Sequence, residues 1–249
     1  PTFNDMAPFV YFIDPNTFFA GNAAVQPATA NSVKGDLLWK RAVFSLSYTA
    51  EKNTITNFTP QVDPANNKQT LVAENQKGKN IFSGNITFPI TVTTWWNMQN
   101  NLQGNKTDLH ARYKGQPLLI HMTNLTATST QSFTLPKNYT VELSAFYLSG
   151  GLFGIYKVEP FGSLNFGLQK KLGPEAGTLS LNISDFSGPP RYRLSVDAPE
   201  HNLVTNGSLR FAVTTFKLTY TKRFGNANVK EKRSRVTGSE EEKQRVQSN

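Results

Sequence analysis

The sequence contains no cysteine, and histidine is rare, with three in 249 residues. The absence of cysteine excludes a disulfide framework, a thiolate zinc site and a cysteine nucleophile. The three histidines, His110, His121 and His201, are far apart and lack metal-ligand spacing. We therefore expect surface or lumen positions for them, and no metal or other cofactor.

Catalytic motifs and long apolar runs are also missing. No Gly-x-Ser-x-Gly elbow, phosphate loop or dinucleotide fingerprint occurs. The carboxylates are sparse, and Glu142 and Asp185 have no spacing that forces a catalytic pair. No run of roughly 18 apolar residues is present, which excludes a transmembrane helix. The sequence therefore predicts neither an enzyme nor a helical membrane protein.

Positive charge is spread along the chain and not concentrated in one arm. The formal net charge is +9, and the hydrophilic segment 225–249 contributes six basic and four acidic residues. Because this segment carries little of the net charge, we do not expect a nucleic-acid partner. A solvated tail is the simpler interpretation.

Alternation of apolar and polar residues dominates the chain from about residue 31 to residue 224. It is clearest at 139–147, 164–168, 179–183 and 216–220. A period of two predicts β-strands, and no helical pattern separates them. The nine expected strands, joined as successive hairpins, are 31–40, 42–54, 78–89, 95–108, 117–135, 139–149, 158–172, 178–196 and 203–224.

Strand length and loop asymmetry favour a membrane barrel. Several expected strands exceed the five or six residues usual in globular sheets, and about 9–11 residues of tilted strand cross a bilayer. Short turns on one side and longer loops on the other are typical of outer-membrane barrels. The expected short periplasmic turns are 40–41, 89–94, 136–138 and 173–177, and the longer external loops lie around 55–77, 109–116, 150–157 and 197–202.

Aromatic residues gather near the expected strand ends. Rings at two levels would form the girdles found where hydrocarbon meets headgroups. Only hydrophilic sequence follows Phe224, which is therefore expected to be the barrel-terminal aromatic. The expected girdle residues are Trp39, Trp95, Trp96, Tyr139, Tyr147 and Tyr220.

Alternation alone leaves two all-β folds open. In a soluble sandwich, such as a lectin-like or jelly-roll shell protein, the apolar rows point inward. In an antiparallel up-and-down transmembrane β-barrel they face lipid, and Glu142, Lys217 and Thr219 line the lumen. Bacterial single-chain barrels have an even number of strands, so nine strands are expected to be a portion of a larger barrel.

The barrel interpretation divides the chain into three parts. Residues 1–30 are expected to be an external loop segment, 31–224 the barrel strands, and 225–249 a charged periplasmic tail.

Five stretches, in order along the chain, resemble one family. They are "DMAPFVYFIDPNTFFAGN", "FPITVTTWWN", "LPKNYTVELSAFYLSGGLFGIYKVEP", "LQKKLGPEAGTLSLNISDF" and "LTYTKRFGNANVKEKRSRVTGSEEEKQRV". Together they resemble the C-terminal barrel portion of the Bacteroidetes-type outer-membrane β-barrel family, a branch of the TonB-dependent receptors. The chain departs from the family pattern at residues 23–25 and 187–188, both in expected loops.

The resemblance implies a bacterial outer-membrane receptor that captures an external ligand and imports it non-covalently. It also implies several partners: an N-terminal plug, the remaining strands of a barrel of about 22 strands, a TonB-type energy transducer, and outer-membrane lipid. The identity of the external ligand is not indicated. Its contacts are expected from the loops around 55–77, 109–116, 150–157 and 187–202.

Overall fold

The computed structural model describes residues 1–224 apart from 8, 64, 174–175, 211–212 and 223. The expected tail, 225–249, lies outside these residues. The described chain is almost entirely strand, with one short helix, α1 (Phe3–Met6), and short 3₁₀ turns at Pro136–Asn138 and Pro199–His201. No helix in the described residues is long and apolar enough to cross a membrane.

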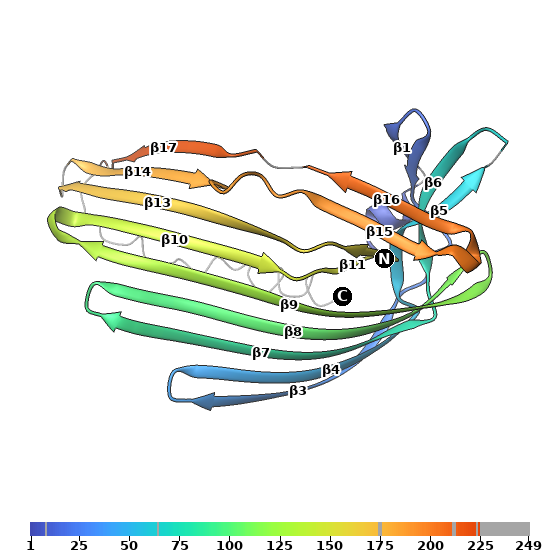
Figure 1. Cartoon of the computed structure of the whole chain (residues 1–249), viewed down its shortest axis with the longest axis horizontal. Helices are drawn as coiled ribbons and strands as arrows, with labels where there is room; N and C mark the ends of the chain where they lie inside the picture. The colour runs from blue at the N-terminus through green and yellow to red at the C-terminus, as the bar shows by residue number, and fades with distance from the viewer. Residues whose placement is uncertain (8, 64, 174–175, 211–212, 223, 225–249) are drawn as a thin grey trace, which may run out of the picture.

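A nine-stranded antiparallel sheet forms the body of the molecule (Figure 1). Its strands follow one another as hairpins, in the spatial order β17-β14-β13-β10-β9-β8-β7-β4-β3. Within the described residues the two edges, β3 and β17, do not pair, so the sheet is a barrel wall that is not closed. The strands are β3 (Thr29–Trp39), β4 (Ala42–Lys52), β7 (Gly78–Thr93), β8 (Trp96–Tyr113), β9 (Gln116–Leu135), β10 (Tyr139–Leu148), β13 (Phe161–Gly173), β14 (Gly177–Ser184) and β17 (Thr215–Thr221).

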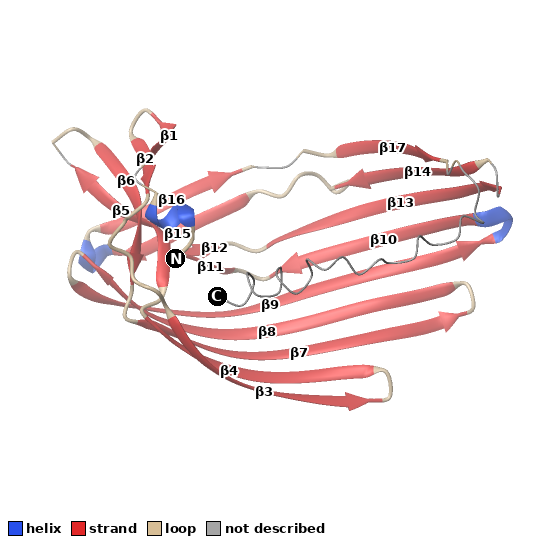
Figure 2. Ribbon diagram, turned by 180° about the vertical axis from the view of Figure 1, so that it is seen from behind, coloured by secondary structure: helices blue, strands red, loops and turns tan. Residues whose placement is uncertain are grey.

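Two four-stranded sheets lie at the end of the body opposite the short turns (Figures 1 and 2). The first has the order β1-β2-β6-β5 and includes a parallel pairing of β2 with β6. The second has the order β11-β12-β15-β16. Their strands are β1 (Val10–Asp14), β2 (Thr17–Ala20), β5 (Ile55–Asp63), β6 (Lys68–Asn75), β11 (Gly151–Phe153), β12 (Tyr156–Val158), β15 (Tyr192–Ala198) and β16 (Leu203–Leu209).

Register places the apolar rows of all nine strands on one face of the sheet, which we call the apolar face. Directly paired residues of antiparallel strands share a face. One such row runs Leu143↔Phe166↔Ile183↔Phe216 across β10, β13, β14 and β17. Many of these side chains are exposed, including Leu37, Leu46, Ile86, Leu102, Leu125, Leu143, Leu164, Phe216 and Leu218. A soluble sandwich would bury such a face; here no other described segment covers it.

Polar residues on the apolar face satisfy one another. Trp96 Nε1 donates to Gln131 Oε1 at 2.8 Å, and Gln131 Nε2 donates to Ser129 Oγ at 2.7 Å. Ser129 Oγ in turn donates to Asn100 Oδ1 at 2.7 Å. An unpaired polar group in hydrocarbon costs several kcal/mol. This chain of hydrogen bonds makes the polar residues tolerable on a lipid-facing surface.

The apolar face has a limited height, which we call the apolar band. On β8 and β9 it runs over the paired segments 96–104 and 125–133, and on β7 the segment 84–90 pairs with 98–104 of β8. A strand of about nine residues is roughly 27 Å long, and tilted by about 40° it has a height of roughly 20 Å, close to the apolar band of about 25 Å in outer-membrane barrels. The band therefore matches the thickness that a barrel must present to lipid.

Beyond the band, at the loop end, the two faces of β8 and β9 exchange character. On the apolar face the side chains become polar at Lys106, Asp108, His110 and Arg112, all of which pair with β9. On the opposite face, polar along most of its length and called the polar face, Leu109 becomes buried at 2% exposure. The inversion marks the level at which the apolar band ends on these strands.

Two expected strands are wrong in length. The expected strand 178–196 is two strands, β14 and β15, separated at residues 185–191, where Asp185 and Gly188 have φ of +52° and +102°. The expected strand 203–224 is likewise β16 and β17. In the first case a strand of the body ends and a strand of the smaller sheet follows, whereas in the second a strand of the smaller sheet comes first and a strand of the body follows. Gly188-Pro189-Pro190 supplies no ladder donors at either proline, so the pairing stops there.

Two expected connections also differ. The expected external loop 109–116 is instead the end of the β8–β9 hairpin, closed by Lys114-Gly115 with φ of +49° and +79°. The expected turn at 89–94 is the two-residue turn Thr94-Trp95, because β7 continues through Pro89 to Thr93. The first difference matters most, since the extended hairpin reaches beyond the band and supports the smaller sheets.

Candidate functional site

The sheet β11-β12-β15-β16, which we call the cap, packs against the polar face where β8 and β9 leave the band. Ile155 and Tyr156, at 1% and 7% exposure, join Leu109 and Ile120 in one buried cluster. The other members are Ala111, Tyr113, Leu118, Val196, Ala198 and Leu203. Burial of these apolar side chains holds the cap over the inner side of the wall.

Burial raises the pKa of Tyr156 to about 12, and the nearby Tyr113 adds to the shift. A group whose pKa is raised in the folded state stabilises that state fully below its ordinary pKa of 10.0. The contribution is then lost as the pH rises from about 10 to about 12. We therefore expect the amide protection of the cap, measured by hydrogen exchange, to fall over this range.

In the variant Tyr156→Phe, which has no phenol to ionise, cap protection should persist to higher pH than in the unaltered protein. Loss of protection at the same pH in both proteins would show that Tyr156 does not control the alkaline opening.

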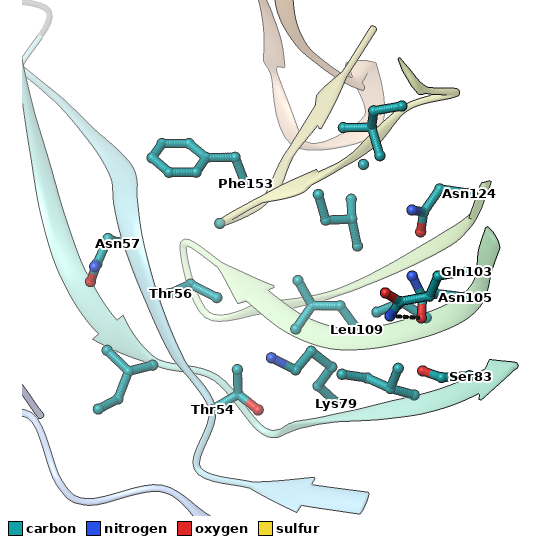
Figure 3. A pocket seen from close by; sticks show the side chains of 17 residues that line it. Thr54, Thr56, Asn57, Lys79, Ser83, Gln103, Asn105, Leu109, Asn124 and Phe153 are labelled. Carbon is teal, nitrogen blue, oxygen red and sulfur yellow. Dashed lines mark hydrogen bonds between the residues drawn. The ribbon is translucent and has the colours of Figure 1, made fainter. Parts of the chain in front are cut away.

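A cavity of about 610 Å³ lies between the cap and the polar face (Figure 3). Its floor comes from the inward rows of β7, β8 and β9, and its rim from the start of β5 and the β11–β12 turn. The lining residues are Thr54, Ile55, Thr56, Asn57, Lys79, Ile81, Ser83, Gln103, Asn105, Thr107, Leu109, Asn124, Leu148, Gly151, Leu152, Phe153 and Gly154. This volume lies within the range of about 300–1,000 Å³ typical of small-molecule sites.

The cavity offers neutral hydrogen-bonding groups beside apolar ones. Gln103 Nε2 donates to Asn105 Oδ1 at 3.1 Å. Lys79 is the one charged residue among the lining residues, and its Nζ lies 3.3 Å from Glu51 Oε2. Because this ion pair neutralises the lysine, the surface favours amides and hydroxyls over free ions. No cluster of three His, Asp or Glu able to hold a metal occurs in the described residues.

Two buried oxygens at the rim lack hydrogen-bond partners. They are Thr54 Oγ1, on a residue at 2% exposure, and Asn57 Oδ1. An unsatisfied buried polar group costs about 1–3 kcal/mol. Both residues line the cavity, so a hydrogen-bonding group on a bound molecule that reached these oxygens would satisfy them.

Gly154 fixes the position of the rim. Its φ is +62°, and a Cβ at this position would collide with the backbone oxygen of Asn57. We expect Gly154→Ala to destabilise the cap by about 2 kcal/mol, since an L-residue pays about 1–2 kcal/mol in the left-handed region and the contact adds to it. Hydrogen exchange of the β11–β12 amides measures the change.

Gly115→Ala is the matched control, because φ there is +79° but an added Cβ meets nothing within 4 Å. An equal effect from both substitutions would mean that the contact of Gly154 with β5 contributes nothing.

The structure places the expected girdle residues at both ends of the apolar band. Trp39, Trp95, Trp96, Tyr139 and Tyr220 lie at the short-turn end, and Tyr147 lies at the loop end. Trp95, Trp96 and Phe133 form one cluster, with ring centroids 5.6–6.3 Å apart. Their role as an interfacial girdle stays a prediction.

Other expected site residues are spread over the sheet. Phe224 is 85% exposed just after β17, and Lys222 Nζ lies 5.3 Å from its ring centroid. Glu142, Lys217 and Thr219 lie on the polar face, as their pairs with Gly167, Asn182 and Ser180 show. Barrel termination at Phe224 and a lumen lining stay predictions.

The histidines do not gather. His110 lies exposed on β8, His121 Nδ1 is 2.6 Å from Asp108 Oδ1, and His201 Nδ1 is 2.9 Å from Gln116 Oε1.

Of the four loop segments expected to hold ligand contacts, two supply several lining residues of the cavity. They are the starts of 55–77 and 150–157, whereas 187–202 lies in or beside the cap and 109–116 supplies only Leu109. Sequence reasoning missed the floor residues Ser83, Gln103 and Asn124. They sit in the polar rows of long strands, and nothing in the pattern distinguishes them from other lumen positions.

A lipid-matched apolar band, a polar inner face and short turns at one end define an outer-membrane-type β-barrel wall. The model described as "Outer membrane protein beta-barrel family" matches residues 1–221. The chain therefore belongs to this family, and its place is the bacterial outer membrane. No curated protein matches the chain. Family membership decides between the two folds left open by alternation, and the soluble sandwich is excluded.

Proposed function

We propose that the chain is the C-terminal part of a TonB-dependent receptor barrel, which binds an external ligand and imports it without chemical change. The observation that carries the proposal is the open wall, whose edges β3 and β17 are unpaired in the described residues. Exposed backbone groups are not tolerated in lipid. The edges therefore pair with the remaining strands of a larger barrel.

The polar face supports passage of a polar molecule through the interior. Its rows present amides and hydroxyls such as Asn101, Gln103, Asn105 and Ser180. A barrel of about 22 strands encloses a lumen that a plug domain fills. In this proposal an N-terminal plug occupies the lumen below the cavity, and an energy transducer in the inner membrane moves it.

The cavity is the proposed external capture site. Ser83, Gln103 and Asn124 provide hydrogen bonds from the wall, and Phe153 provides an aromatic surface from the cap. Binding through neutral groups orients a ligand without activating it, so the proposal includes no catalytic step.

Cells that lack the energy transducer test the import step, because a captured ligand should then accumulate on the receptor. The protein is purified in detergent from these and from wild-type cells, and bound molecules are detected by native mass spectrometry. We expect higher occupancy by a small molecule without the transducer. Ser83→Trp, which fills the cavity, should abolish this occupancy, whereas Ser180→Trp, on the polar face away from the cavity, should not.

A blot of outer-membrane fractions with an antibody against 225–249 tests the larger barrel separately. A band well above 27.7 kDa is expected. A band near 27.7 kDa, or equal occupancy in both strains, would contradict the proposal.

A further inference from the structure

Cationic side chains occupy the apolar face just beyond the band at the loop end. Lys106 lies in the row Phe82↔Lys106↔Thr123, at the upper limit of the band. Two rows further, Lys52 and His110 flank Gly78 in the row Lys52↔Gly78↔His110. Rows on one face are about 7 Å apart along a strand. Lys106 therefore lies at the edge of the apolar band, and Lys52 and His110 lie further out.

A hollow lies beside these residues. It has a volume of about 290 Å³ and is lined by Glu51, Lys77, Gly78, Lys79, Asn80 and His110. Of these, Gly78, Asn80 and His110 belong to the outward rows, whereas Glu51 and Lys79 pair in a row of the polar face. Glu51 is paired with Lys79 at 3.3 Å, and the one carboxylate on the outward rows, Asp108, is paired with His121 at 2.6 Å. Glu51 is therefore already occupied, while Lys52, Lys106 and Arg112 are exposed and appear in no ion pair in the described structure.

We propose that Lys52, Lys106, His110 and Arg112, the headgroup patch, bind phosphate groups of phosphorylated lipids in the outer leaflet of the membrane. The position of the patch indicates which kind of molecule binds there. A residue on the apolar face at this height lies at the surface of the bilayer, outside the lumen and away from the capture cavity. Clusters of basic residues next to a membrane-spanning segment attract anionic headgroups, each contributing about 1 kcal/mol.

Buried side chains on the opposite face of the same strands hold the patch in place. Between Lys106 and Arg112 the inward side chains are Thr107, Leu109 and Ala111, and the last two are buried under the cap. The hairpin therefore continues as a rigid ladder through the headgroup level and does not become a loose loop. Because the backbone that carries these cations is already fixed, little conformational entropy is lost when a headgroup binds.

The test uses the protein purified from outer membranes in detergent. Its thermal unfolding midpoint is followed while micelles are doped with phosphorylated lipid A, with the same lipid after enzymatic dephosphorylation, or with inorganic phosphate in solution. We expect stabilisation by the phosphorylated lipid and little by the other two. In the triple variant Lys52→Gln, Lys106→Gln, Arg112→Gln, the apparent affinity should fall by about 100-fold, as expected for three such contacts.

A matched variant, Lys34→Gln, Lys171→Gln, Lys217→Gln, removes the same charge from the polar face and should bind the lipid unchanged. Lys106→Arg should retain binding and shows that charge, and not lysine itself, is required. Equal stabilisation by dephosphorylated lipid, equal stabilisation by free phosphate, or unchanged affinity in the triple variant would each overturn the proposal. Because Lys52, Lys106 and Arg112 are exposed, the heat-modified gel shift of a folded barrel should persist in the triple variant.

Discussion

Leu143→Arg is expected to prevent stable assembly in the outer membrane. Leu143 lies on the apolar face of β10, midway between Tyr139 and Tyr147, and pairs with Phe166 and Gln131. A cation near the bilayer midplane of a barrel costs about 2–4 kcal/mol, and less toward the interfaces. The free energy of folding into lipid vesicles should fall by that amount, with a matching loss of protein from outer-membrane fractions.

Ser144→Arg is the control one residue away. Ser144 pairs with Asn165 and Thr130 on the polar face, which we predict to line a water-filled lumen. The added cation should therefore change the folding free energy by less than about 1 kcal/mol. Normal assembly of the Leu143 variant, or equal loss in both, would mean that the apolar face does not meet lipid.

Leu109→Ala should have the second large effect, confined to the loop end. Leu109 is 2% exposed, lies in the cap cluster and also lines the cavity. Truncating a buried leucine costs about 2–5 kcal/mol, depending on how far the surroundings relax. We expect faster proteolysis and faster hydrogen exchange in β11, β12, β15 and β16, together with unchanged insertion of the barrel strands.

Leu119→Ala provides the comparison. Leu119 is 51% exposed and pairs with His110 on the opposite face of the same hairpin, so its truncation should cost less than about 1 kcal/mol. If both truncations have the same effect, the cap is not held by the buried cluster.

The nine strands of the body could be predicted because period-two patterning is a local property. Strand 139–148, for example, follows directly from alternation and from the turn that precedes it at Pro136–Asn138. Tight hairpins then fix the neighbours of each strand. Family membership confirms the membrane barrel that strand length and loop asymmetry indicated.

The cap and the β1-β2-β6-β5 sheet could not be predicted in the same way. The parallel pairing of β2 with β6 joins residues about 50 positions apart, and no local pattern specifies a partner at that distance. Gly188-Pro189-Pro190 indicates a break at 185–191. However, the apolar–polar alternation on both sides favoured one continuous strand. The floor of the cavity could not be predicted, because Gln103 and Asn105 follow the same pattern as the other polar residues of these strands.

The most direct test of the central claim is a cysteine-accessibility scan along β8, made possible because the chain has no cysteine. Single substitutions, each in intact outer membranes, are treated with a water-soluble maleimide. On the apolar face Met98→Cys and Leu102→Cys should resist labelling, whereas His110→Cys should react.

The polar face should show the reverse order along the same strand. Gln103→Cys and Asn105→Cys should react through the lumen, whereas Ala111→Cys, buried under the cap, should resist. A reversal of the reactive face between residues 105 and 110 is the predicted result. An unchanged alternation to the end of β8, or labelling at residues 98 and 102, would contradict the account of a lipid-facing band that ends below the headgroup patch.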